Sequence, residues 1–331
     1  MKVAILYNQV GTESAQDELD VITQVNTVTQ ALTALGYEPV TLSLSLNIAS
    51  IVNQLKLLQP AFVFNLVESL AGTGRFLHFA PAILEHLQLP YTGSGSDALY
   101  LTTNKLLSKE RLRAYRIATP PWMRINCHSK KKPKFPPPYI VKPVWEDASV
   151  GLNDASVFYH EQDLLEHFTT HLNLTNELFT EAYIAGREFN LSILASKEGP
   201  QVLPAAEIEF IDYPAEKPRI VDYRAKWDVN SFEYQHTVRR FDFADCDKQL
   251  IAELTKIARR CWKIFNLCGY ARVDFRIDLS GKSWVLEVNT NPCISPDSGF
   301  VAASERAGLD YNTIIRRIID DIPRPPKLQE S

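Results

Sequence analysis

The sequence of 331 residues lacks the features that mark several classes of protein. Its 35 Lys and Arg residues nearly balance 39 Asp and Glu residues, whereas proteins that bind nucleic acid through phosphates present a strongly basic face. The five cysteines are odd in number and show no C-x-x-C spacing, which favours reduced thiols over a zinc ribbon or disulfide framework. No apolar run approaches the ~20 residues of a membrane span, and the N-terminus lacks the apolar stretch of a signal peptide. We therefore expect a cytoplasmic protein that acts on small molecules, without nucleic-acid or membrane partners.

The first 95 residues show alternating strand and helix patterns. Val3–Tyr7 is a short apolar run, typical of a strand buried on both faces of a parallel sheet. Apolar residues then recur every three or four positions over 21–35, and Gly36 ends this predicted helix. The other elements expected here are strands at 39–44 and 61–66 and a helix at 48–58. Such alternation predicts an α/β fold with right-handed crossovers and an open parallel sheet.

The pattern changes after the glycine-rich segment Tyr91–Gly95. A helix carrying Lys105 is expected next, followed by the proline-rich stretch 128–138, whose P-x-x-P spacing fits either a polyproline ligand or a solvated loop between strands. The later elements form a mixed, α+β type of pattern. They are strands at 139–143, 178–184, 188–195, 202–211, 271–277 and 283–289, and helices at 248–265 and 313–319.

The most specific cluster of polar residues lies near the C-terminus. Glu287 and Asn289 are two apart in an apolar strand, so their side chains leave the same face. The turn residues 280–282 join this strand to the one that carries Asp274, which predicts a hairpin with the three side chains together. Converging carboxylates are costly unless a cation is bound, and all-oxygen ligation suits Mg²⁺. Two ordinary polar strand edges are the alternative.

Two further segments are suited to binding a phosphorylated ligand. Lys142 ends a predicted buried strand, and the loop that follows contains Ser149 and Gly151, a pattern that can hold phosphate by charge and backbone N–H groups. Glu181 and Glu188 flank a strand–turn segment and could serve an adenine amino group and a ribose hydroxyl. Taken alone, the first segment is also compatible with a surface lysine and a plain turn, and the second with a strand edge and turn.

Taken together and in this order, these segments resemble the ATP-grasp fold, and most closely the D-alanine–D-alanine ligase family. The resemblance covers residues ~90–320 well and the first 90 mainly as a pattern. The matching phrases are Tyr91-Thr92-Gly93-Ser94-Gly95, Val141-Lys142-Pro143, Ser149-Val150-Gly151, Gly186-x-Glu188-Phe189, Asp222-Tyr223-x-Ala225-Lys226, Arg272-x-Asp274 and Glu287-Val288-Asn289-Thr290-Asn291-Pro292, extended by Ser298 and Ala307-Gly308. The implied domains are a Rossmann-like unit at 1–95, a central subdomain at 96–182 and a C-terminal subdomain with the metal site at 183–331.

The resemblance implies an ATP- and Mg²⁺-dependent carboxylate–amine ligase that works through an acyl phosphate and releases ADP and phosphate. It also implies small amino-acid-like substrates and a homodimer. The implied nucleotide-binding residues are Lys105, Lys142, Ser149, Glu181, Ala182, Ile184, Glu188 and Lys226. The implied metal ligands are Asp274, Glu287 and Asn289, and the implied catalytic positions are Arg272, Ser298 and Cys293. Among these, Arg272 matches the arginine that stabilises charge on the acyl centre, and Cys293 replaces a glycine whose backbone lines the oxyanion site.

The departures from the family pattern gather around the substrate pockets. The glutamate that holds the first substrate's amino group has Gln16 at its aligned place, with Glu13, Asp17 and Glu18 as neighbours, and Glu18 is the residue expected to bind the substrate. A histidine–glycine signature is replaced by 64–69, and a serine and a tyrosine linked to that glutamate are Ala148 and Trp227. These changes predict a substrate other than D-alanine. The alternatives are a ligase that joins an amino acid to a mycosporine-type cyclohexenone, and a catalytically silent ATP-binding protein.

Three weaker signals allow a functional and a structural interpretation. Cys293 is either a covalent nucleophile or part of a positioning loop, and no histidine lies near it in sequence. Gly93–Ala98 fits the dinucleotide fingerprint but follows three strand–helix units, which favours a turn between domains. The histidines that stand alone, expected to be structural rather than general bases, are His78, His86 and His236.

Overall fold

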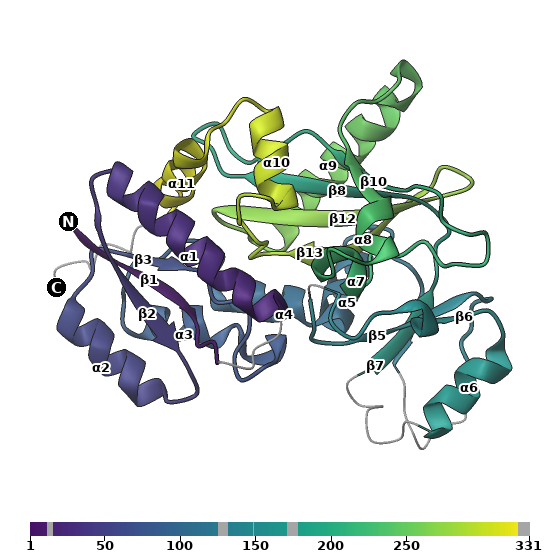
Figure 1. Ribbon diagram of the computed structural model, residues 1–331, viewed down its shortest axis with the longest axis horizontal. Helices are drawn as coiled ribbons and strands as arrows, with labels where there is room; N and C mark the ends of the chain where they lie inside the picture. The colour runs from purple at the N-terminus through teal and green to yellow at the C-terminus, as the bar shows by residue number, and fades with distance from the viewer. Residues whose placement is uncertain (12–15, 125–131, 148, 171–177, 324–331) are drawn as a thin grey trace.

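Three β-sheets follow one another along the chain in the computed structural model (Figure 1). The structure describes residues 1–11, 16–124, 132–147, 149–170 and 178–323, without the side chains of Asp17, Glu18 and Thr170. The first sheet is parallel and the other two are antiparallel. This arrangement confirms the predicted α/β class with an α+β C-terminal part.

The N-terminal sheet is covered by helices on both faces, which explains its continuous apolar strand. In β1, Val3 and Ile5 pack with helices α1 and α11, whereas Ala4 and Leu6 pack with α2 and α3. Because α11 comes from the end of the chain, the two ends of the protein share one core. The strand order is β2 (Glu38–Leu44), β1 (Lys2–Asn8), β3 (Val63–Asn65), and the helices are α1 (Gln16–Ala34), α2 (Ile48–Leu58), α3 (Phe79–His86) and α11 (Tyr311–Asp320).

The central sheet is small and packs against α5 and α6. Leu164 of α6 is buried against Tyr139 and Val141, and Leu106 of α5 is buried with Phe179. The strand order is β4 (Trp122–Arg124), β7 (Leu178–Ala182), β5 (Tyr139–Pro143), β6 (Val157–Phe158), and the helices are α5 (Lys105–Ala114) and α6 (Glu161–Thr170).

The C-terminal sheet is built on the long pair β8 and β12, with the predicted hairpin β12–β13 at one side. Helix α9 covers it through Leu254, Ala258 and Cys261, all fully buried. The strand order is β11 (Thr237–Arg240), β10 (Ala206–Phe210), β8 (Gly186–Leu194), β12 (Tyr270–Asp278), β13 (Ser283–Asn289), and β9 (Gln201–Val202) pairs with β8. Helix α9 spans Lys248–Ile264 and α10 spans Gly299–Arg306.

Two of the expected elements are each divided in the structure. The helix predicted around Lys105 is two helices, α4 (Ser96–Thr103) and α5, because the Asn104 side chain accepts bonds from Leu106 and Leu107 and starts a new helix. The strand predicted at 202–211 is interrupted between β9 and β10, where Pro204 has no N–H to offer a ladder. Helix α10 and the short helices α7 (Tyr223–Trp227) and α8 (Phe232–His236) were not predicted.

Other expectations from the sequence agree with the described chain. Strands β4 and β5 flank the proline-rich stretch; residues 125–131 lie outside the description, and 132–138 form neither helix nor strand, as the loop interpretation predicts. Gly95 is the N-cap of α4, so the Gly93–Ala98 segment is a turn that enters a helix. The division into domains at residues 95 and 182 stays a prediction. Over the described residues we find no helix with the length and apolar character needed to span a membrane.

Candidate active site

A pocket of about 650 Å³ is lined by residues from all three sheets. The predicted residues that line it are Lys105, Lys142, Ser149, Glu181, Ala182, Ile184, Glu188, Lys226, Arg272, Asp274, Glu287, Asn289, Cys293 and Ser298. Its volume lies within the range of small-molecule sites. The structure therefore brings together, in one pocket, residues that are spread over almost 200 positions of the sequence.

The β12–β13 hairpin places the predicted metal ligands side by side. Asp274 is the register partner of Glu287, and Arg272 is the partner of Asn289. The register then shifts so that Phe275 pairs with Val285, and the β-bulge lets both Leu286 and Glu287 line the pocket. Strict alternation would have directed Leu286 to the other face. The predicted convergence of Asp274, Glu287 and Asn289 is present in the described structure.

Cations and an amide hold the two carboxylates. The Arg272 guanidinium donates to both Asp274 oxygens at 2.8 Å, and the Asn190 amide donates to Oδ1 at 2.8 Å. Burial raises the pKa of Asp274 although Arg272 opposes it. Burial would also raise the pKa of Glu287, but Lys105, Lys226 and Arg272 outweigh burial and hold that pKa below its usual value. Glu287 thus stays ionised, and Asp274 takes up a proton more readily than an exposed aspartate.

Lys105 connects the hairpin to the loop that follows β5. It is the first residue of α5, its side chain is buried, and its ammonium lies 2.6 Å from Asp147 and 3.2 Å from Glu287. Burial lowers the pKa of this lysine, but Asp147 and Glu287 outweigh that effect and raise it overall. A permanently charged ammonium is therefore fixed beside the predicted metal ligands. Asp147 is a pocket residue that the sequence did not single out.

Lys142 and Glu181 form a buried ionic group at the central sheet. Glu181 is 1% exposed, and its carboxylate lies 2.6 Å from the Lys142 ammonium and 2.5 Å from that of Lys109. Burial would raise the pKa of Glu181, but Lys109 and then Lys142 hold it low. Glu188 is likewise paired, at 2.6 Å, with the Arg276 guanidinium. Both acidic residues that were predicted to contact a nucleoside therefore line the pocket, and each is already paired with basic side chains of the protein.

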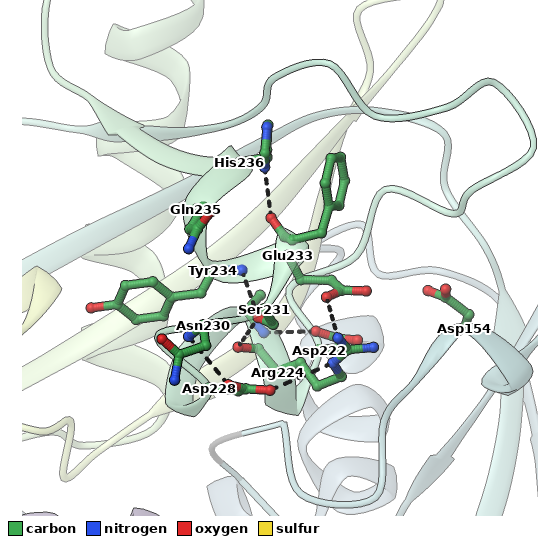
Figure 2. A network of polar contacts seen from close by, with 12 residues as sticks. Asp154, Asp222, Arg224, Asp228, Asn230, Ser231, Glu233, Tyr234, Gln235 and His236 are labelled. Carbon is green, nitrogen blue, oxygen red and sulfur yellow. Dashed lines mark hydrogen bonds and ion pairs between the residues drawn. The ribbon is translucent and has the colours of Figure 1, made fainter.

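The segment that carries Lys226 is fixed by its own network of polar contacts (Figure 2). Asp222 accepts from the Ala225 N–H at the start of α7, and Ser231 caps α8 through the Tyr234 N–H. Arg224 joins the two short helices by its ion pair with Glu233 at 3.3 Å. Within the described chain the Lys226 ammonium has no ion-pair partner, and burial and then Arg272 lower its pKa.

Two contacts tie this segment to the central sheet. The Ser149 hydroxyl donates to the Val221 carbonyl at 2.6 Å. Lys217 forms ion pairs with Asp154, beside β6, and with Glu233 of α8, the second at 2.8 Å. The loop after β5 and the segment before α7 thus enclose one side of the pocket together. Ala148, within that loop, lies outside the described residues, while Trp227 lines the pocket.

Two acidic residues near the N-terminal sheet, Asp20 and Glu68, also line the pocket, and they were not predicted from the sequence. The Ser295 hydroxyl and the Cys293 thiol both donate to Asp20 of α1, at 2.8 and 3.0 Å. Gln24 donates to Glu68 at 2.8 Å and to Asp20 at 3.3 Å. Asp20 is one helical turn beyond Gln16, and Glu68 lies in the segment 64–69 that departs from the family. The two departures noted in the sequence were therefore close to these two acids.

The residues considered for binding the substrate's amino group lie near the start of α1. Gln16 is exposed and does not line the pocket. The side chain of Glu18 and all of Glu13 lie outside the described residues, so the Glu18 prediction stays untested. None of the histidines expected to be structural, His78, His86 and His236, is among the residues found to line the pocket, which agrees with that expectation.

Cys293 lies in the pocket but has the wrong electrostatic surroundings for a nucleophile. Burial raises the pKa of its thiol well above the ordinary value, and the carboxylates of Glu68 and Asp20 raise it further. Reactive cysteines need the opposite, a cationic neighbour that favours the thiolate. The contacts of Cys293 therefore favour the positioning loop over the covalent nucleophile.

The other end of the pocket is basic and lies at the N-terminus of α10. Ser298 is the N-cap of α10 and accepts from the Val301 N–H. Arg239 of β11 packs against Gly299, its Nε and Nη2 atoms 3.5 Å from where a Cβ would stand. The sequence gave no sign of Arg239, because β11 and its position beside α10 were not predicted.

An open parallel sheet, two antiparallel sheets and a pocket lined by residues of all three are the arrangement of the ATP-grasp fold. A family model described as the D-ala D-ala ligase C-terminus matches residues 115–320, more than half of the chain. The chain therefore belongs to the D-alanine–D-alanine ligase family.

Individual relatives agree with this family. An uncharacterized protein of Sinorhizobium fredii, y4sG, is 33% identical over 262 residues, which cover 78% of this chain and 73% of the relative. The D-alanine–D-alanine ligase of Aquifex aeolicus is 28% identical over 323 residues, covering 96% of this chain and 100% of the relative. A crystal structure of the D-alanine–D-alanine ligase from Bacillus anthracis, complexed with ATP, has a TM-score of 0.73 and 23% identity, covering 97% of each chain. This structural likeness shows the shared fold.

Proposed function

We propose that the chain is an ATP-dependent ligase that joins a carboxylate to an amine through an acyl phosphate, with release of ADP and phosphate. The observation that carries the proposal is the convergence of Asp274, Glu287 and Asn289 with Lys105 and Arg272 in one pocket. A catalytically silent ATP-binding protein would not require an arginine fixed at the centre of the site. Family membership supports the same reaction class.

The nucleotide would lie between the central and C-terminal sheets. Ala182 and Ile184 leave β7 at the pocket wall, where their backbone groups suit an adenine ring. Glu188 is positioned for a ribose hydroxyl, and Lys105 and Lys142 for the phosphates, with Ser149 in the loop over them. The solved relative from Bacillus anthracis was crystallised with ATP, which supports this placement.

The donor set of the hairpin fits magnesium. Asp274, Glu287 and Asn289 offer carboxylate and amide oxygens from neighbouring strands, the chemistry that Mg²⁺ prefers beside substrate phosphates. Burial raises the pKa of Asp274, so a further cation at this carboxylate would offset an existing desolvation cost. When bound, Mg²⁺ would supply positive charge to the phosphoryl oxygens.

The protein's own groups have defined tasks in this reaction. A carboxylate is a poor acyl donor, because its leaving group would be an oxide, and phosphorylation replaces that group with phosphate. Lys105 and Lys142 neutralise charge on the transferred phosphoryl group, whose transition state needs positioning and electrostatic stabilisation above all. Arg272 then stabilises the oxyanion formed when the amine attacks, a contact typically worth about 3–4 kcal/mol.

The two ends of the pocket suit the two substrates differently. Asp20 and Glu68 provide negative charge for the ammonium group of the carboxylate donor. Ser298, at the N-terminus of α10, suits the carboxylate of the amine substrate, because helix N-termini favour anions. Asp20 lies one helical turn beyond Gln16, the position aligned with the family's glutamate, and Glu68 follows β3. Because the acids of this pocket are placed differently from that glutamate, we propose that the donor differs from D-alanine.

A phosphate-release assay with ATP, Mg²⁺ and a panel of D- and L-amino acids tests the function, and mass spectrometry identifies the product. We expect phosphate release that depends on amino acids, and a product joined by a peptide-like bond. Nucleotide binding without ADP formation across the panel would favour the silent ATP-binding protein. Robust turnover on D-alanine alone would overturn the altered substrate while leaving the ligase activity in place. Homodimerisation and a cytoplasmic location stay predictions.

A further inference from the structure

Two consecutive arginines of β11 differ in how their charges are compensated. Arg240 faces two carboxylates, with its guanidinium 2.6 Å from Glu207 and 2.9 Å from Glu209. Arg239 lines the pocket instead, and no carboxylate of the described residues lies within ion-pair distance of it. The register explains the contrast, because Arg240 is opposite Glu207 whereas Arg239 is opposite Ile208.

The neighbours of Arg239 place it at the basic end of the pocket. Its guanidinium packs against Gly299, the residue that follows the N-cap Ser298 of α10. The charged side chains that act on it are Arg272, which repels it, and Asp297, which attracts it without an ion pair. Arg239 is exposed, and its guanidinium has no ion-pair partner among the described residues, so it is accessible to an anion that enters the pocket.

This end of the pocket already has a group for one carboxylate, namely the N-terminus of α10 with its N-cap Ser298. Arg239 adds a planar, always charged fork that matches a carboxylate in a bidentate manner. We propose that Arg239 binds a second carboxylate, so that the amine substrate is an acidic amino acid rather than a neutral one. The inference rests on the proposed ligase function and names the substrate class of its basic end.

The test compares acidic acceptors with their amides in the full-length protein. ADP formation is measured with ATP, Mg²⁺, a fixed pool of neutral amino acids and, in turn, aspartate, asparagine, glutamate or glutamine of each hand. We expect each preferred acid to exceed its amide in kcat/KM by roughly ten- to a hundredfold, the range for hydrogen bonds to charged groups. Arg239→Gln should reduce this ratio towards one through the KM of the acid, and Arg239→Lys should restore part of it.

The matched control is Arg240→Gln, which removes the neighbouring charge outside the pocket and should keep the wild-type ratio. Equal use of acid and amide by an active wild-type enzyme would overturn the inference and leave the ligase function standing. The inference would also be overturned if Arg239→Gln raised the KM for ATP and left the ratio of kcat/KM for acid and amide unchanged. That result would assign the arginine to nucleotide binding. A stronger preference for O-phosphoserine than for either acid would replace the carboxylate with a phosphate. No ADP formation with any acceptor would overturn the ligase function and the inference with it.

Discussion

Asp274 lies directly opposite Glu287 in the ladder between β12 and β13, and a β-bulge follows at once. The hairpin alone would leave two acids in the same buried site. Arg272 and Lys105 make the arrangement possible, because each brings a fixed positive charge to one of the acids. The same four side chains thus stabilise the fold locally and set the charge of the site.

Replacing Asp274 by Asn should abolish most of the ligase activity, because the variant loses a charge from the proposed metal site. We expect kcat/KM for ATP to fall at least a hundredfold, as removal of one electrostatic contact in an active site often does. Glu253→Gln is the control, since Glu253 contacts Ser283 of the same hairpin outside the pocket. Both variants are assayed by steady-state ADP formation. An equal loss of kcat/KM in the two variants would show that Asp274 has a structural role only.

Replacing Glu181 by Gln should destabilise the protein strongly at neutral pH, because Lys109 and Lys142 would lose their buried partner. Breaking such a pair typically costs about 3–5 kcal/mol. The pKa of Glu181 is depressed in the folded state, so its stabilisation is fully present above its unfolded value near 4.5 and is lost as the pH falls below it. Urea unfolding at several pH values should show the difference in free energy of unfolding between wild type and variant becoming smaller in acid. A difference that does not change with pH would contradict the assignment of Glu181 as the ionised partner of the two lysines.

Cys293 should resist alkylation, because burial and the acids beside it raise the pKa of its thiol. Cys246 is exposed and should react readily, which provides an internal control within the same chain. Peptide mapping by mass spectrometry after iodoacetamide treatment at pH 8 measures both sites. Rapid labelling of Cys293 would revive the covalent-nucleophile interpretation.

Replacing Asp20 by Asn should weaken binding of the donor substrate more than that of ATP. The lost charge–ammonium contact predicts a rise of about ten- to a hundredfold in the KM of the donor. Asp163→Asn, on the exposed face of α6, removes the same charge far from the pocket and should leave the kinetics unchanged. A KM for the donor that is unaffected in Asp20→Asn would show that the ammonium group lies elsewhere.

Local patterns in the sequence were sufficient for the parts of this fold that depend on neighbours in the chain. The alternation around Glu287 and the turn at 280–282 predicted the hairpin, since a short turn fixes the pairing of its strands. The pairing of Asp274 with Glu287 itself depends on the β-bulge, without which Asp274 would lie opposite Leu286. Contacts between distant elements were not predictable in this way. Asp20 meets Cys293 only because α1 and the end of the chain share a core, and Arg239 meets Gly299 only because β11 lies beside α10.

The departures from the family were visible in the sequence, but their consequences were not. Gln16 indicated that a glutamate was missing, and the acids that line the pocket nearby are Asp20, one turn further on, and Glu68, in another segment. A helix repeats its faces every three or four residues, so the neighbouring turn was the natural place to look. The partner in segment 64–69 required the three-dimensional structure.

The transfer of a carboxylate oxygen of the substrate to phosphate is the most direct test of the acyl-phosphate intermediate. Amino-acid substrates labelled with ¹⁸O in their carboxylates are incubated with the protein, ATP and Mg²⁺ in unlabelled water, and the phosphate formed is analysed by mass spectrometry. An acyl phosphate transfers one carboxylate oxygen to phosphate in each turnover, so the account predicts phosphate that carries one ¹⁸O. Phosphate without the label, released at the same rate, would mean that water attacks ATP and would contradict the ligase mechanism.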